Sequence, residues 1–264
     1  MTGLTVADLS VRYGAVTVVD EISFDVPRGS LTVMVGPNGS GKTSCLRGIL
    51  GLADSSGRAT WDGGDLTAMD PAERARRASY VAQTRDWSLG PSVRSVVGLG
   101  RLAYGDPWRD TAEDREAVAA ALATCGLDDL ADRRASDLSG GESQRVSIAR
   151  GLAQAAPLMI LDEPTTHLDP RHAGEIASLL RRLVGEGLTV LVTAHDLAWA
   201  SSVADQVVVM KAGKICGAGG PELLRDPAVL SAVYGVGFAL YQSGSSTIAL
   251  PSAIKTPDAP SIRD

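Results

Sequence analysis

The first group of residues that could do chemistry is a glycine-rich loop. Residues 36–43 read GPNGSGKT and directly follow the apolar run LTVMV. The spacing matches G-x-x-x-x-G-K-[ST], a loop whose backbone N–H groups surround the phosphates of a nucleotide. Lys42 would then reach the β- and γ-phosphates, and the Thr43 hydroxyl would bind Mg²⁺. The alternative is a chance glycine turn, which the flanking strand and helix patterns disfavour.

The second group of residues that could do chemistry is a pair of adjacent acids. Residues 158–163 read LMILDE, an apolar strand that ends in two acids. Ligands of α/β sheets bind beyond the carboxyl ends of the strands. Asp162 would hold Mg²⁺, directly or through water, and Glu163 would polarise an attacking water. The alternative is a strand-end turn with two solvated acids.

A second anion site is indicated at LSGGE, residues 138–142, which precedes the helical run SQRVSIARGLAQ. Ser139 and the free N–H groups of a helix start could bind an anion. A capping box would also explain Ser139 and Glu142. It does not explain the adjacent Gly140 and Gly141, which weaken a helix start. We therefore favour the anion site and keep the capping box as the alternative.

The elements that would position these residues follow from the hydrophobic pattern. Continuous apolar runs, typical of strands buried on both faces of a mostly parallel sheet, occupy residues 31–35, 158–161, 189–193 and 207–210. Alternating segments at 4–8 and 22–26 also predict strands, and residues 172–186 predict an amphipathic helix. Residues 85–154 show helical patterns only. Strands that alternate with helices predict an α/β fold with a helical insertion.

Composition narrows the function classes. The 264 residues carry a net charge of −6, which argues against a nucleic-acid partner. The three cysteines are far apart and predict neither a disulfide framework nor a metal site, in keeping with a reducing cytosol. The N-terminal segment lacks the features of a signal peptide, and no run of about 18 apolar residues could span a bilayer. If the protein serves transport, another chain must provide the path.

In chain order, GPNGSGKT, LSGGESQR, LMILDEPTTHLD and VTAHD resemble the motifs of ABC transporter nucleotide-binding subunits, over roughly residues 4–250. The resemblance implies an ATPase with ATP and Mg²⁺ as cofactors. It also implies a head-to-tail dimer with a second copy, in which the LSGGE segment faces the partner's nucleotide. Transmembrane permease subunits, and indirectly a substrate-binding protein, would be the other partners. The location would be peripheral, on the cytoplasmic face of the cell membrane.

The resemblance also assigns roles to residues that would be unremarkable alone. Tyr13 would stack on adenine, His195 would bond the γ-phosphate, and Asp169 would communicate across the dimer. Gln83 would contact Mg²⁺ and water. The implied nucleotide-binding residues are Tyr13, Gly36, Pro37, Asn38, Gly39, Ser40, Gly41, Lys42, Thr43, Ser44, Ser139, Gly140, Gly141, Glu142 and Asp169. The implied catalytic residues are Lys42, Gln83, Glu163 and His195, and the implied metal ligands are Thr43, Gln83 and Asp162.

The implied fold is a P-loop (RecA-like) ABC ATPase core of the α/β class, with an antiparallel β subdomain and an inserted helical subdomain. The core would comprise residues 1–84 and 155–250. The insertion, with the signature motif, would comprise residues 85–154. Residues 251–264 would form a loose tail.

Three details resemble the ATPases of ferric siderophore, haem and cobalamin uptake: LSGGE in place of LSGGQ, PTTHLD, and VVGLGRLAYG before the signature. The expected function is ATP hydrolysis that powers import of an iron chelate, with ferric siderophore ahead of haem and cobalamin. A non-transport ABC ATPase, such as one for cluster assembly, is an alternative. A non-enzymatic nucleotide-binding module is another, opposed by Lys42, Glu163 and His195.

The segment at 85–109 allows two interpretations. Its apolar residues could receive a short helix of a membrane partner, in which case Val96→Asp would leave the fold intact. They could equally form the core of the insertion. These residues are Trp87, Leu89, Val93, Val96 and Val97.

Overall fold

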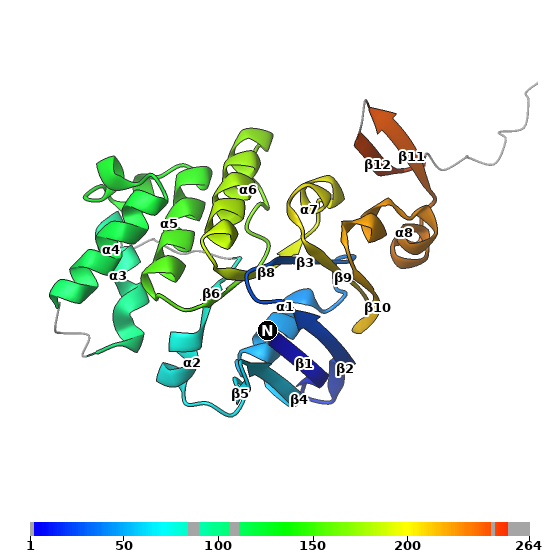
Figure 1. The fold of residues 1–264 in the computed structure, drawn as a ribbon, viewed down its shortest axis with the longest axis horizontal. Coiled ribbons are helices and arrows are strands. Elements are labelled where there is room, and N and C mark those ends of the chain that lie inside the picture. Colours follow the sequence, from blue (N-terminus) through cyan, green and yellow to red (C-terminus); the bar gives the residue numbers. More distant parts are fainter. Residues whose placement is uncertain (1–2, 84–89, 106–110, 244–245, 253–264) are drawn as a thin grey trace, which may run out of the picture.

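The computed structural model describes residues 3–83, 90–105, 111–243 and 246–252. Within these ranges the chain forms a six-stranded sheet, a four-stranded sheet and a two-stranded hairpin, with helices around them (Figure 1).

The six-stranded sheet positions the site. Its order is β10 (Lys214–Gly219), β9 (Gln206–Lys211), β3 (Leu31–Val35), β8 (Thr189–Ala194), β7 (Leu158–Leu161) and β6 (Ala78–Val81). Strands β9 to β6 are parallel to their neighbours, and β10 is an antiparallel edge. Every residue of β3, β7 and β8 is buried. The apolar runs in the sequence therefore do correspond to strands covered on both faces.

The two faces of this sheet belong to two separate cores. Alternate residues such as Val33 and Val35 pack with helices α5 (Gly140–Ala153), α6 (Pro170–Gly185) and α7 (Leu197–Val203). Met34, between them, packs with α1 (Lys42–Ile49) and the four-stranded sheet. Figure 1 shows α6 and α7 on one side of the sheet and α1 on the other. Because successive side chains of a strand point to opposite faces of the sheet, each strand contributes residues to both cores.

The second sheet is antiparallel, as expected for the N-terminal edge. Its order is β2 (Val16–Val26), β1 (Leu4–Tyr13), β4 (Asp54–Trp61) and β5 (Gly64–Asp65). Strand β4 has no counterpart in the sequence-based prediction. Its sequence, DSSGRATW, is mostly polar, and only Ala59 and Trp61 are buried. A strand with one solvated face and few core residues gives a weak alternation signal.

Helices dominate the described part between β6 and β7. They are α3 (Val93–Gly98), α4 (Ala112–Thr124) and α5, with 3₁₀ turns η1 (Leu99–Ala103), η2 (Asp128–Leu130) and η3 (Ala135–Asp137); a further helix, α2 (Pro71–Arg77), directly precedes β6. Among the described residues from 90 to 154, the backbone forms no strand, apart from an isolated bridge between Ser92 and Arg134. This agrees with the helical patterns. The helices share their hydrophobic core with the sheet, because Val96 and Val81 belong to one cluster.

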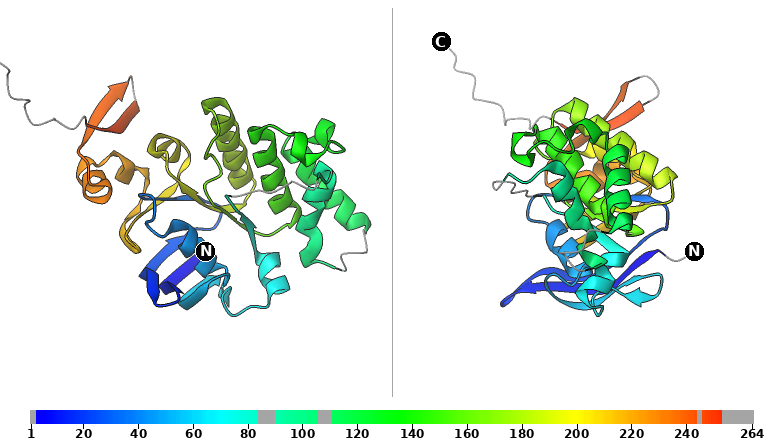
Figure 2. Two further views of the ribbon diagram at one scale, coloured as in Figure 1. Left: turned by 180° about the vertical axis from the view of Figure 1, so that it is seen from behind. Right: turned by 90° about the vertical axis from the view of Figure 1, so that its left-hand side faces the viewer.

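The C-terminal part contains η4 (Pro221–Arg225), α8 (Pro227–Tyr234) and a hairpin of β11 (Phe238–Ser243) and β12 (Ser246–Pro251). The sequence reasoning did not predict this hairpin. In Figure 2 it lies at the opposite end of the molecule from α3, α4 and α5. The expected tail begins at the last strand residue, and residues 253–264 lie outside the described ranges. Among the described helices, none has the length and apolar composition that crossing a bilayer requires.

Of the segment at 85–109, the structure describes residues 90–105, and there it decides between the two interpretations. Val93, Val96 and Val97 are fully buried in the main core, so the interpretation of these three as a docking surface is wrong. They share one face of α3, and that face points inward. Trp87 and Leu89 lie outside the described residues. The exposed apolar side chains follow in the next turns, at Leu99, Leu102 and Tyr104.

We predict that Val96→Asp destabilises the fold, contrary to the docking interpretation. It would bury an unpaired carboxylate, at a cost of about 4 kcal/mol or more. Leu102→Asp is the matched control, since Leu102 is 53% exposed. Thermal unfolding followed by circular dichroism should give a large drop in Tm, or no folded protein, for Val96→Asp only. Equal Tm values for the two variants would contradict the assignment of Val96 to the core.

Candidate active site

The phosphate loop connects β3 to α1 and depends on glycine at two positions. Gly41, the residue before the helix, has φ +102°, a conformation that glycine tolerates best. A Cβ on Gly36 would lie 2.2 Å from the Met210 carbonyl oxygen, so a larger residue cannot fit. The loop therefore has the strand–loop–helix context that the sequence predicts, with the first N–H groups of α1 at its end.

The turn between β9 and β10 holds this loop from outside. The Gly213 N–H donates to the Ser40 carbonyl at 2.9 Å, and the Asp20 N–H donates to the Gly213 carbonyl at 3.0 Å. Gly213, which is 173 positions from Ser40 in the sequence, thus fixes the loop through backbone atoms. The sequence reasoning placed a turn at KAGK but did not assign it to the site.

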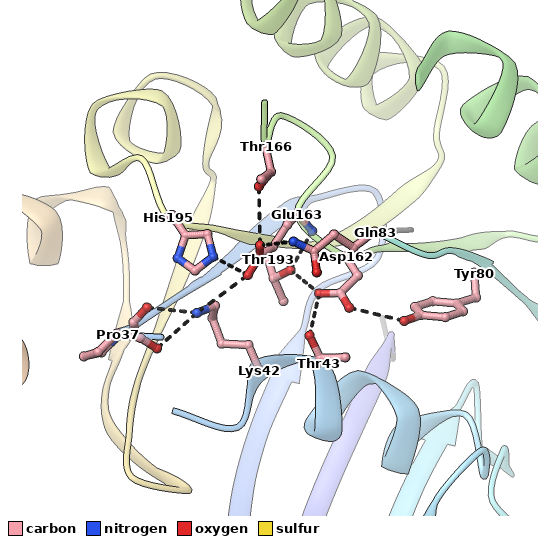
Figure 3. A network of polar contacts seen from close by, with 11 residues as sticks. Pro37, Lys42, Thr43, Tyr80, Gln83, Asp162, Glu163, Thr166, Thr193 and His195 are labelled. Atoms are coloured by element: carbon pink, nitrogen blue, oxygen red, sulfur yellow. Dashed lines mark hydrogen bonds and ion pairs between the residues drawn. The ribbon is translucent and has the colours of Figure 1, made fainter. Parts of the chain in front are cut away.

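Lys42 is almost completely buried, with 5% of its surface exposed. Its Nζ donates to the carbonyl oxygens of Gly36 at 2.9 Å and Pro37 at 3.3 Å (Figure 3). It also lies 3.9 Å from Glu163 Oε1. Burial lowers the pKa of Lys42, and the negative charges of Glu163 and Asp162 act in the opposite direction. The ammonium is held at the base of the loop, next to the acidic pair.

Asp162 follows β7 and is 2% exposed. Its Oδ1 accepts from Thr43 Oγ1 at 3.1 Å and from Thr193 Oγ1 at 2.8 Å. Its Oδ2 accepts from Tyr80 Oη at 3.3 Å. Thr43 and Asp162 supply a hydroxyl and a carboxylate oxygen side by side, and oxygen ligands of this kind suit Mg²⁺. In the described part of the chain, no group of three or more His, Cys, Asp or Glu residues is arranged so that it could hold a metal ion.

Glu163 lies where three other candidate residues converge. Its Oε2 accepts from Gln83 Nε2 at 2.8 Å, and its Oε1 pairs with His195 Nε2 and faces Lys42. Figure 3 shows these side chains pointing toward one another from separate elements. The backbone of Glu163 has φ +49°, which is unusual for a residue with a Cβ. The Glu163 N–H donates to Thr193 Oγ1 at 2.8 Å, and this bond holds the unusual conformation.

Lys42, Glu163 and His195 border a cleft of about 350 Å³, which is within the size range of small-ligand sites, whereas Asp162, Gly36 and Pro37 are not among its lining residues. The lining comes from the phosphate loop, from the three other predicted residues and from one residue of β2: Val18, Asn38, Gly39, Ser40, Gly41, Lys42, Thr43, Ser44, Gln83, Glu163 and His195. The structure therefore brings together residues that are up to 177 positions apart in sequence.

Other predicted residues do not line this cleft. Tyr13, at the end of β1, is 45% exposed. Asp169 caps α6, where it accepts from the His172 N–H at 2.8 Å. Residues 139–142 also lie apart from the described lining. Within one chain the second predicted anion site is thus separate from the phosphate loop.

The start of α5 contains the capping box that the sequence left as an alternative. Ser139 Oγ accepts from the Glu142 N–H at 3.3 Å, and Glu142 Oε2 accepts from the Ser139 N–H at 2.8 Å. Hydrogen bonds to the Glu142 carboxylate lower the pKa of Glu142. The bond from the Ser139 hydroxyl has the larger effect, and the bond from the Ser139 N–H has the smaller one. Packing explains one of the glycines: a Cβ on Gly141 would lie 2.2 Å from the His172 ring. Packing against His172 therefore accounts for Gly141, and only Gly140 is left without a structural explanation.

Sequence reasoning missed Thr193, Thr166 and Tyr80. Thr193 lies two residues before His195 at the end of a buried strand, beside the strand that carries the acidic pair. A threonine near the end of an otherwise apolar buried strand is a signal in the sequence that could have identified it as a site residue. Thr166 Oγ1 donates to Glu163 Oε2 at 3.3 Å. Nothing in the sequence distinguishes Tyr80 from an ordinary aromatic residue of a strand.

Comparison with known proteins places this geometry in a family. Residues 19–166 match the family model described as ABC transporter. A hemin import ATP-binding protein of Pseudomonas entomophila is 38% identical over 239 residues, which cover 88% of this chain and 92% of that protein. A petrobactin import ATP-binding protein of Bacillus subtilis is 36% identical over 231 residues, with 87% and 91% covered.

Solved structures agree with the sequence relatives. A nucleotide-free ATP-binding cassette from an ABC transporter has a TM-score of 0.81 at 28% identity and covers 89% of this chain and 99% of that one. An inward-facing metal-chelate type ABC transporter has a TM-score of 0.84 at 24% identity, with 96% and 99% covered, and shows the shared fold. A dimeric bacterial ABC transporter cassette has a TM-score of 0.71 at 25% identity, with 83% and 98% covered. Because the family model spans over half of the chain and the relatives match nearly end to end, the protein belongs to the ABC transporter family as an ATP-hydrolysing subunit.

Proposed function

We propose that this ATPase powers the import of an iron chelate through separate membrane subunits, with Mg²⁺ as the metal of its ATP site. The observation that carries the mechanism is the convergence of Lys42, Gln83 and His195 on the Glu163 carboxylate. The names of the relatives support the cargo, since they include importers of hemin and of petrobactin.

The phosphate loop and Lys42 bind the nucleotide phosphates in this proposal. Successive N–H groups of the loop and the start of α1 face the anion, and Lys42 adds a buried positive charge. Thr43 and Asp162 would hold Mg²⁺, with Gln83 beside them. When bound, the metal would offset the negative charge of the phosphates. Tyr13 supplies an exposed ring for the adenine base.

Glu163 acts as the general base for the attacking water. Its hydrogen bonds with Gln83 and Thr166 fix the orientation of one carboxylate oxygen, and His195 and Lys42 face the other. Fixed orientation is the main contribution that a protein makes to phosphoryl transfer. His195, which is 37% exposed, lies at the rim where the γ-phosphate would sit.

A second copy of the chain completes the site in our proposal. Ser139 and Gly140 are exposed and lie away from the cleft of their own chain. In a head-to-tail dimer they face the nucleotide of the partner, and Asp169 lies near the shared interface. The similarity to a dimeric cassette supports this arrangement. The capping box does not oppose it, since the helix start keeps its other N–H groups.

Residues 1–84 and 155–250 form the ATPase core in this proposal, and residues 85–154 form an inserted helical subdomain that transmits motion to the permease. The exposed side chains of Leu99, Leu102 and Tyr104 are available for that contact. We place the protein on the cytoplasmic face of the cell membrane, with a substrate-binding protein as an indirect partner. The importer names of the relatives favour this reading over a cluster-assembly ATPase.

We predict that Glu163→Gln binds ATP, hydrolyses it about 10²–10⁴-fold more slowly and accumulates as a dimer. The amide oxygen can still accept from Gln83 and Thr166, but it cannot act as a carboxylate base. Phosphate release and gel filtration with ATP measure the two effects. Glu186→Gln, which changes an exposed carboxylate after α6, is the matched control. Turnover near the wild-type rate in Glu163→Gln would refute the assignment.

We predict that cysteines at Asn38 and Gly140 form a disulfide between chains when ATP is bound. Both positions are exposed, and a Cβ on Gly140 would meet only Leu168 at 3.8 Å. Each variant with one added cysteine, tested alone, controls for other contacts, including those of the exposed native Cys216. Non-reducing electrophoresis of a mixture of the two single variants should give the crosslinked dimer. In the variant that carries both cysteines, a product that forms only within one chain would exclude the head-to-tail arrangement.

We predict that deletion of the gene reduces uptake of a radiolabelled iron chelate. Uptake of a ferric siderophore and of hemin is measured side by side, because the relatives include a petrobactin importer and hemin importers. Cobalamin is the third compound tested. Complementation with wild type restores uptake and Glu163→Gln does not. Loss of uptake of a sugar, amino acid or phosphate instead would refute the cargo and leave the ATPase mechanism unaffected.

A further inference from the structure

Tyr80 makes a contact with the acidic pair that none of the assigned roles explains. It is the third residue of β6 and lies in register with Ile160 of β7. Its partly buried ring packs on the core that contains α1 and the N-terminal sheet. Its hydroxyl donates to Asp162 Oδ2 at 3.3 Å, as Figure 3 shows.

The hydroxyl occupies the side of the carboxylate away from the other donors. Thr43 and Thr193 both donate to Oδ1. Within the part of the chain that the structure describes, Tyr80 is the side chain that donates to Oδ2. The Asp162 N–H also donates to the Val81 carbonyl at 2.9 Å. With both oxygens bonded, the carboxylate cannot rotate about its last torsion without losing a hydrogen bond. Its orientation relative to Thr43 is therefore fixed partly by Tyr80.

The direction of the hydrogen bond between Tyr80 and Asp162 follows from the chemistry of the two groups. An ionised carboxylate can only accept and a phenol can donate, so the proton of this hydrogen bond is that of the Tyr80 hydroxyl.

We propose that Tyr80 is a positioning residue for the metal: its hydroxyl orients Asp162 beside Thr43 and thereby sets the Mg²⁺ affinity of the ATP-loaded site. This inference rests on the proposed function, in which Asp162 and Thr43 hold the metal. It assigns the hydroxyl a role separate from the packing of the ring.

The test uses Tyr80→Phe, which keeps the ring and removes the hydroxyl. First, a fluorescent, non-hydrolysable ATP analogue is titrated into the protein in the presence of excess EDTA, which gives the affinity for the analogue without metal. Second, in a separate sample without EDTA, Mg²⁺ is titrated into the analogue-loaded protein. We expect unchanged analogue affinity in EDTA and an apparent Mg²⁺ affinity that is about three- to tenfold weaker, the scale of one lost hydrogen bond. Mn²⁺ binding followed by electron paramagnetic resonance should weaken to a similar extent.

Two further variants make the result decisive. Tyr241→Phe, on the exposed hairpin, is the matched control and should bind the metal as wild type does. Thr43→Ala removes a proposed ligand and should lose more affinity than Tyr80→Phe. Normal Mg²⁺ affinity in Tyr80→Phe, with a loss in Thr43→Ala, would overturn the role of Tyr80 and leave the proposed function intact. Equal weakening of analogue binding in EDTA would also overturn it, because the hydroxyl would then be merely structural. If neither wild type nor Thr43→Ala responded to Mg²⁺, the proposed function itself would fail.

Discussion

The buried carboxylate of Asp162 is the group on which the arrangement of the site depends. A charge that is 2% exposed must be compensated by hydrogen bonds, because its hydration is lost. Those bonds come from Thr43 on α1, Thr193 on β8 and Tyr80 on β6. Four elements must therefore be in place before this carboxylate can be buried. The same requirement brings the phosphate loop into contact with the strand that carries Glu163.

The parallel sheet makes this meeting possible. Strands β6, β7 and β8 are neighbours, and their carboxyl ends lie at one edge. The residues that follow them, at positions 83, 163 and 195, are therefore close in space although they are far apart in sequence. Packing on both faces makes the edge rigid, since each strand contributes alternate side chains to two cores. A site built in this way needs few contacts within its own loops.

Much of this could be predicted from the sequence, for identifiable reasons. The phosphate loop, LMILDE and the buried strands are local patterns, and the order of the motifs indicated the family and its fold. The antiparallel strand β4 was missed because its outward face is polar, and the valines of α3 were ambiguous because apolar composition alone does not distinguish core from surface. Tyr80 and Thr193 could not be assigned, because their roles depend on which strands are adjacent. The capping box at Ser139 was foreseen as an alternative, whereas the His172 ring that requires Gly141 could not be.

The turn between β9 and β10 has a consequence for how this sequence can vary over evolutionary time. Ala212 and Gly213 both have positive φ, as in a two-residue turn of type I′. Backbone atoms of Gly213 make the hydrogen bonds to the phosphate loop and to β2, and Lys214 adds an exposed ion pair to Asp20 at 3.1 Å, so a substitution of either flanking lysine leaves the backbone hydrogen bonds in place. The length of the turn has no such freedom. One inserted residue would shift the carbonyl and the N–H that connect Ser40 to Asp20, and homologous chains should therefore differ here by substitution and not by insertion or deletion.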